Sequence, residues 1–111
     1  MRVYLPATLT VLAALAEHGE LPPATDRFVA ADDSEDAEYD ALTEAASAAA
    51  GMLGARGRRV VIVADVPDVD GPVPVNLVVA VHADPEEVDP ADTDLPDLGW
   101  YAVQEIEDLL A

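Results

Sequence analysis

Lysine is absent from this chain, and its only strong cations are five arginines, whereas aspartate and glutamate together number 23. The formal net charge of the 111 residues is therefore −18 at pH 7. Proteins that bind nucleic acid use clustered lysines and arginines, which displace counterions from the phosphates. The composition excludes that class of protein. Because an acidic surface repels anionic lipid headgroups, it also argues against binding to a membrane surface.

Cysteine is absent as well, which excludes disulfide bonds, thiolate catalysis and cysteine-based zinc sites. No stretch approaches the roughly 18 apolar residues of a membrane-spanning helix. The first residues also lack the basic and apolar regions of a signal peptide. We therefore expect a cytoplasmic protein, and no residue pattern indicates a cofactor.

Aromatic residues make up only 5% of the chain, but hydrophobic residues of all kinds make up 51%, which is too many for a disordered acidic tail. We expect residues 1–111 to form a single domain with an aliphatic core and an acidic surface. Residues 83–98 differ from the rest because they contain seven acidic residues and three prolines. A mobile, solvated segment is predicted there.

Hydrophobic residues at three- and four-residue spacing predict a first helix that Thr8 caps and Gly19 ends. Short strands are predicted before and after it, at residues 3–5 and 27–30. A second helix is predicted over residues 34–53, because the acidic residues at its beginning suit a helix N-terminus. One side of this helix carries Tyr39, Leu42, Ala46, Ala49 and Leu53.

An unbroken run of β-branched residues within 58–65 predicts a strand at the centre of a sheet. A second apolar strand, residues 75–81, follows a proline-containing loop over residues 66–74. We expect the two strands to be antiparallel neighbours. The chain should close with a helix over residues 99–110, with Trp100 in its first turn.

The predicted order of elements is β-α-β-α-β-β-α, with no internal repeat. Elements of this kind bury their apolar faces by packing in layers around one core. We therefore expect the α+β class, as a two-layer α/β sandwich. A small mixed sheet of three or four strands would pack against about three helices.

A group of glycines and arginines resembles the loops that bind phosphate. Gly51, Gly54 and Gly57 recur at three-residue spacing, and Arg58 and Arg59 follow. Phosphate loops place their glycines after a strand and before a helix, whereas these come after a helix and before a strand. We favour a helix end with arginines near the negative pole of the helix dipole, and keep an anion site as the alternative.

Asp65 at the end of the central strand, together with Asp68, Asp70 and Gly71 in the loop that follows, resembles part of a calcium-binding loop. If Gly71 took the sixth position of an EF-hand, valine and leucine would stand at the first and twelfth. The leading carboxylate and the bidentate glutamate are thus missing. An acidic turn is the favoured interpretation, with a weak divalent-cation site as the alternative.

His82 and Asp84 form a candidate pair for acid–base catalysis. If a pocket formed there, the imidazole could act as a base with the carboxylate orienting it. A histidine at the surface is the simpler interpretation. Serine hydrolysis is excluded, because Ser34 suits a helix cap and Ser47 lies in an alanine-rich helix without a nucleophile motif. We assign no catalytic residue and no metal ligand.

Trp100 is the best candidate for an exposed anchor residue, although packing in the core is the commoner fate of a tryptophan. In a helix, Trp100 and Tyr101 would point about 100° apart, so that one can pack inward while the other reaches the surface. We expect Glu105, Glu107 and Asp108 to point outward from the same helix. These five residues form the candidate surface for a partner.

Four segments of the chain resemble a family of small acidic actinobacterial proteins of unknown function. They are Arg2–Pro6, Glu38–Ala46, Val60–Asp65 and Trp100–Ile106, and the run Trp-Tyr-Ala-Val-Gln-Glu-Ile is the most specific. The resemblance covers most of the chain. It implies a short intracellular protein with no assigned activity, and it transfers no site residues.

The leading hypothesis is a non-enzymatic binding or regulatory module whose acidic face meets a basic protein partner. The alternative from another class is a small enzyme that uses His82 with nearby carboxylates. A third account is that the charge adapts the protein to a saline cytosol. A deep pocket at His82 would favour the enzyme, whereas a flat acidic face beside an exposed Trp100 would favour the binding module. The sequence does not determine the oligomeric state.

Overall fold

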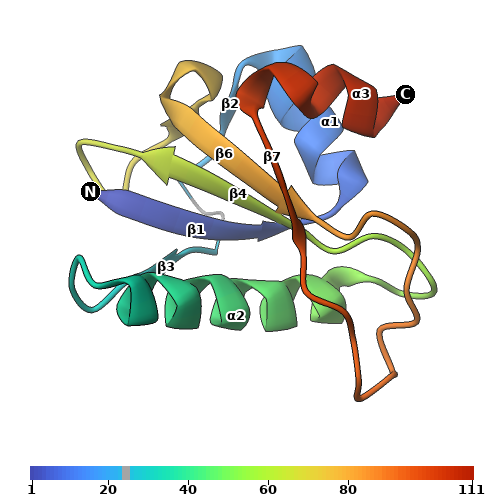
Figure 1. Cartoon of the computed structure of the whole chain (residues 1–111). Helices are drawn as coiled ribbons and strands as arrows, with labels where there is room; N and C mark the ends of the chain where they lie inside the picture. Colours follow the sequence, from blue (N-terminus) through green and yellow to red (C-terminus); the bar gives the residue numbers. More distant parts are fainter. Residues whose placement is uncertain (24–25) are drawn as a thin grey trace.

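The computed structural model describes residues 1–23 and 26–111 and is built around a five-stranded antiparallel sheet (Figure 1). The order of strands across the sheet is β3-β1-β4-β6-β7. Their bounds are β1 Arg2–Ala7, β3 Phe28–Val29, β4 Val60–Asp65, β6 Val78–Ala83 and β7 Gly99–Tyr101. A second, two-stranded sheet pairs β2 (Glu20–Leu21) with β5 (Val73–Pro74).

Helices cover both faces of the five-stranded sheet. Helix α2 (Glu35–Met52) lies along one face, and α1 (Leu9–His18) and α3 (Ile106–Leu110) lie together on the other (Figure 1). The α+β class is therefore confirmed, but the molecule has three layers instead of two. The sheet also has five strands, all antiparallel, where we predicted three or four in a mixed sheet. The fifth strand is β7, which is only three residues long and lies where we predicted a helix.

Strand β4 is the central strand, as its unbroken apolar run predicts. It pairs with β1 on one side and with β6 on the other, both antiparallel. Val61 and Val63 belong to the core beneath α2, whereas Val60 and Ile62 belong to the core beneath α1 and α3. Because side chains alternate between the faces of a strand, a strand covered on both faces must be apolar at every position.

The ends of α1 and α2 follow from their capping residues. Thr8 Oγ1 accepts a hydrogen bond from Val11 N at 3.3 Å, and Ser34 Oγ accepts one from Ala37 N at 3.2 Å. Gly19 ends α1 with φ of 82°, a left-handed conformation that favours glycine. Both helices therefore begin within one residue of the predicted positions.

The buried side of α2 consists of alanines, namely Ala41, Ala45, Ala46 and Ala49. Small side chains let the helix approach the sheet closely. Tyr39, which we placed on the inner side, does not belong to this buried side and is 59% exposed.

The C-terminal segment differs most from its prediction. Residues 99–101 form β7, which pairs antiparallel with β6, and only 106–110 form an α-helix, after a 3₁₀ turn at Val103–Glu105. Trp100 therefore lies in an edge strand and not in the first turn of a helix. Two adjacent aromatic residues suit a strand, and pairing with β6 satisfies backbone groups that a helix would otherwise satisfy internally. The strand predicted at 75–81 is likewise displaced to Val78–Ala83 by a 3₁₀ turn.

Candidate functional site

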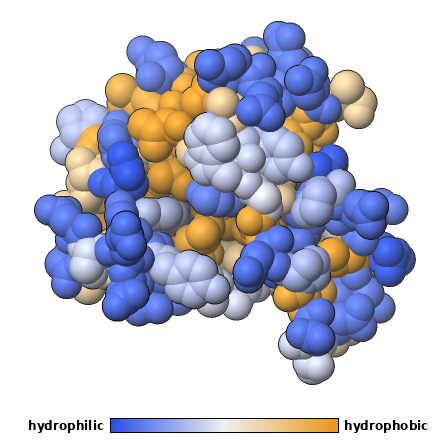
Figure 2. Space-filling model, in the orientation of Figure 1, coloured by the Kyte–Doolittle hydropathy of each residue, from blue (hydrophilic) through white to orange (hydrophobic). Residues whose placement is uncertain are grey.

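A cleft of about 400 Å³ lies between α2 and the edge of the sheet formed by β6 and β7. Its volume falls within the usual range of ligand-binding clefts. On the face seen in Figure 2, hydrophobic side chains reach the surface in the middle of the molecule, while hydrophilic side chains cover most of its margin. Residues that line the cleft include Tyr39, Thr43 and Ser47 from α2, His82 from β6, Trp100 from β7, and residues 95–98.

Two exposed aromatic side chains contribute to this cleft. Trp100 is 61% exposed and Tyr39 is 59% exposed. Trp100 lies opposite His82 in the register of β6 and β7, so both side chains face the α2 side of the sheet. Tyr101 faces the other side, where it packs against the core beneath α1 and α3. The rings of Trp100 and Tyr101 therefore lie on opposite faces of the sheet because side chains alternate along a strand, and not because of the 100° rotation between helical residues that we expected.

The three acidic residues that we grouped with Trp100 lie outside the cleft lining. Glu107 and Asp108 are exposed on α3, as predicted. Glu105 is only partly exposed, because its Oε1 accepts a hydrogen bond from Ala102 N at 3.3 Å at the start of the 3₁₀ turn. Glu105 thus stabilises the turn between β7 and α3.

His82 lies in the cleft and is partly buried. This burial lowers the pKa of its imidazole below the usual 6.5, because the charged form loses hydration. Asp84, the candidate orienting acid, is instead fully buried against Arg59. The carboxylate oxygens of Asp84 accept three hydrogen bonds from Arg59, so a buried ion pair stands in place of the candidate pairing with His82.

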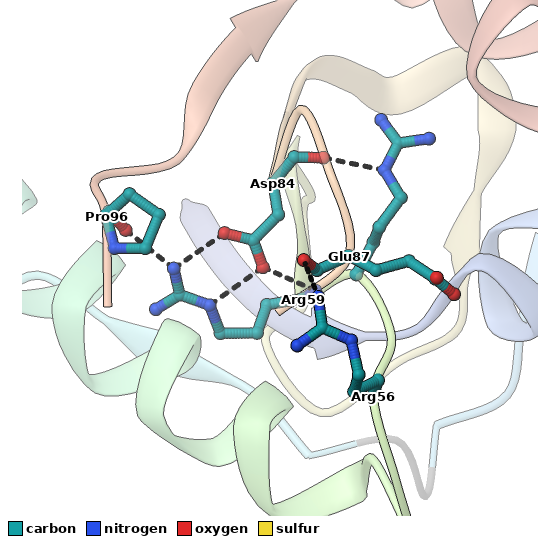
Figure 3. Close-up of polar contacts among 6 residues, drawn as sticks. Arg56, Arg59, Asp84, Glu87 and Pro96 are labelled. Carbon is teal, nitrogen blue, oxygen red and sulfur yellow. Dashed lines mark hydrogen bonds and ion pairs between the residues drawn. The ribbon is translucent and has the colours of Figure 1, made fainter. Parts of the chain in front are cut away.

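Arg59 joins the body of the protein to residues 84–98, which we call the acidic strap. Its Nη2 lies 2.7 Å from Asp84 Oδ1 and also donates to the carbonyl of Pro96 at 2.6 Å (Figure 3). The Arg59 backbone N donates to Asp84 Oδ2 at 2.8 Å. Because Pro96 lines the cleft, this one side chain connects a buried carboxylate to the wall of the cleft.

Two further arginines also bind the acidic strap. Arg58 Nε donates to the carbonyl of Asp84 at 2.7 Å, and Arg56 Nη2 donates to the carbonyl of Glu87 at 3.0 Å (Figure 3). Gly57 and Val88 exchange backbone hydrogen bonds of 3.0 and 2.8 Å. Helix α2 does end in this region, at Met52, but its last turn contains no basic residue, so the predicted placement of the arginines at the helix dipole needs correction. The arginines bind the strap and not the helix dipole.

The acidic residues after β4 form a turn. Asp68 Oδ1 accepts a hydrogen bond from Asp70 N at 2.9 Å, and Asp65 pairs with Arg2 at 2.9 Å, which lowers the pKa of the Asp65 carboxyl. In the part of the chain that the structure describes, no group of three or more histidine or carboxylate side chains is placed to hold a metal ion.

Several cleft residues were not singled out from the sequence. Tyr39, Thr43 and Ser47 occur at every fourth position and therefore share one side of α2. Their spacing could have predicted that these three side chains lie together. Nothing in the sequence pointed to Leu95 and Pro96, because their position depends on the contact between the strap and Arg59.

A comparison with protein families matches residues 1–110 to a family of unknown function, DUF6912. The chain belongs to this family. Membership of DUF6912 agrees with the expected family of unknown function and assigns neither an activity nor a ligand. Comparisons with curated proteins and with solved structures gave no match. Within residues 1–23 and 26–111, none of the helices combines the length and the apolar character required to span a bilayer.

Proposed function

We propose that this protein is a non-enzymatic binding or regulatory module that holds a basic segment of a partner protein in the cleft between α2 and β7. The observation that carries the proposal is Trp100, which is 61% exposed at a cleft of about 400 Å³. Tryptophan is enriched among the anchor residues of protein interfaces, and leaving it exposed costs hydrophobic free energy unless a partner covers it.

The charge of the molecule specifies the chemistry of the partner. A surface with a net charge of −18 attracts basic segments and repels acidic ones. Asp97 lines the cleft and is exposed, so it can pair with a cation bound there. His82 is held in its neutral form by burial, and a neutral imidazole offers a nitrogen that accepts a hydrogen bond from a lysine or arginine side chain.

The enzyme hypothesis has less support than the binding module. His82 does lie at a cleft, as that hypothesis requires. The hypothesis also requires an acid that orients the imidazole. Asp84 does not serve this purpose, because both of its carboxylate oxygens accept hydrogen bonds from Arg59. The hydroxyl of Thr43 donates to the carbonyl of Tyr39 at 2.9 Å within α2 and is therefore not poised as a nucleophile. Acid–base chemistry here would have to proceed without a positioned base–acid pair.

A synthetic peptide tests the proposal. The probe is the basic peptide KVKLKVK, and its acidic counterpart EVELEVE has the same apolar pattern. Trp100 is the single tryptophan, so its emission should shift when KVKLKVK covers it and remain unchanged with EVELEVE. Affinity for KVKLKVK should fall as salt is raised, since screening weakens attraction between opposite charges.

Matched variants separate the cleft from the general acidity of the surface. Calorimetry should show that Trp100→Ala weakens binding of KVKLKVK by at least about 1 kcal/mol, as expected of an anchor residue. The control is Val29→Ala, which truncates a 43% exposed side chain on the opposite edge strand, β3, and should leave affinity unchanged. Equal affinity of wild type and Trp100→Ala, or equal binding of the two peptides, would refute the proposal.

A further inference from the structure

The outer edge of β7 has no neighbouring strand. β7 is the last strand in the order β3-β1-β4-β6-β7 and pairs only with β6 within the described residues. An edge strand presents backbone N–H and C=O groups that another extended chain can pair with. Proteins commonly protect such edges with lysine, a residue that this chain lacks altogether.

The side chains of β7 distinguish its two faces. Trp100 projects on the α2 side, where the cleft lies, while Tyr101 packs against the core on the opposite side. A strand added beside β7 would place every second side chain on the α2 side. An apolar side chain of that strand would therefore lie beside Trp100 at the cleft.

Exposed acidic residues precede and follow β7 in the chain. Asp94 and Asp97 come before it in the acidic strap, and Glu107 and Asp108 follow it in α3. Arg59, the cation that lines the cleft, is already bound by Asp84 and the Pro96 carbonyl. A second copy of this chain would bring another net charge of −18 to the same edge, so electrostatic repulsion opposes pairing between copies. A basic segment meets no such repulsion.

We propose that β7 binds its partner by strand addition, with an extended basic segment pairing along the outer edge of β7 as a sixth strand of the sheet. This inference rests on the proposed function and specifies its geometry. Backbone hydrogen bonds to β7 would provide affinity, the side chain beside Trp100 would provide selectivity, and lysines or arginines would meet the flanking acidic residues.

Backbone methylation of the probe peptide tests the strand geometry. One derivative of KVKLKVK carries N-methyl groups on its lysine residues, and another carries them on its valine and leucine residues. In an added strand, the N–H groups of alternate residues point to opposite edges, so only one derivative loses its hydrogen bonds to β7. That derivative should bind at least about tenfold more weakly than the other, as expected for the loss of more than one hydrogen bond.

The outcomes separate the strand geometry from the binding function. Trp100-dependent binding of KVKLKVK with equal affinities of the two methylated derivatives would overturn strand addition and leave the proposed function standing. Failure of unmethylated KVKLKVK to bind would refute the proposed function and the strand geometry with it. Amide hydrogen exchange provides an independent readout, because a bound strand should slow exchange at Gly99–Tyr101. An unchanged exchange rate throughout β7 in the peptide complex would also overturn the inference.

Discussion

His82 is a basic side chain that the fold keeps in its neutral form. It lies in β6 opposite Trp100, and partial burial lowers its pKa below 6.5. In the unfolded chain the same imidazole binds a proton near its usual pKa of 6.5. Between the two pKa values the unfolded state therefore binds more protons than the folded state, and stability rises with pH.

We predict that His82 destabilises the fold as the pH falls from 7.5 through its unfolded pKa toward its lower folded pKa. The stability contributed by the neutral imidazole is present above pH 6.5 and is lost below it. NMR titration of the imidazole ring should give a midpoint below 6.5, with His82→Gln identifying the resonance. In urea titrations, the free-energy advantage of wild type over His82→Gln should shrink on acidification. A midpoint at or above 6.5 would contradict this assignment.

At the scale of elements, the acidic strap is attached to the body of the molecule through the segment between α2 and β4. Arg59 is 7% exposed and Asp84 is fully buried, and their contact determines where Pro96 lies at the cleft. Removal of one member of a buried ion pair leaves the other charged, desolvated and unpaired. The exposed pair of Arg2 and Asp65 carries no comparable penalty, since water hydrates each partner when the other is removed.

We predict that Arg59→Gln lowers the free energy of unfolding by about 3–5 kcal/mol. The matched control Arg2→Gln should change it by at most about 1 kcal/mol, because the Arg2 and Asp65 side chains are 44% and 49% exposed. Urea denaturation measures the free energy of unfolding of both variants. Hydrogen exchange at Val88 N, which donates to Gly57 O at 2.8 Å, reports on the strap and should accelerate in Arg59→Gln. Similar losses in the two variants would contradict a structural role for the buried pair.

The sequence was sufficient for elements whose own residues determine them. The caps at Thr8 and Ser34 and the apolar run of β4 depend on local patterns, and they lie where the sequence predicted. β7 could not be predicted in this way, since its three residues become a strand only by pairing with β6. The same limit applies to the number of layers, because the sequence did not show which face of the sheet each helix covers.

The candidate site was predicted less completely than the fold. Packing of Trp100 in the core was the favoured interpretation, whereas the side chain is 61% exposed, and its setting in an edge strand was not predicted. Asp84 was considered as a partner of His82 because the two are close in sequence, whereas Arg59, 25 residues away, is its partner. Long-range pairs of this kind leave no periodic signal. The predicted mobility of residues 83–98 stays a prediction, to which the structure adds the arginine contacts that hold the strap.

At the scale of the whole molecule, repulsion among 23 carboxylates opposes folding. The molecule measures 35 × 32 × 24 Å, so its charges interact across its full width when the Debye length is about 30 Å, as at about 0.01 M salt. At about 0.15 M salt the Debye length is about 8 Å, and only neighbouring charges interact strongly. Added salt should therefore remove more repulsion than it removes attraction within the exposed pairs of Arg2.

We predict that the thermal unfolding midpoint rises as sodium chloride is increased between these two concentrations at pH 7. The double variant Asp40→Asn/Glu44→Gln removes two exposed charges from α2. It should start from a higher midpoint in low salt and gain less from added salt, because it has less repulsion to screen. Differential scanning calorimetry at fixed pH measures the unfolding midpoints of the wild type and the double variant. A midpoint that stays constant or falls with salt in the wild type would mean that local pairing, and not repulsion across the molecule, dominates its electrostatics.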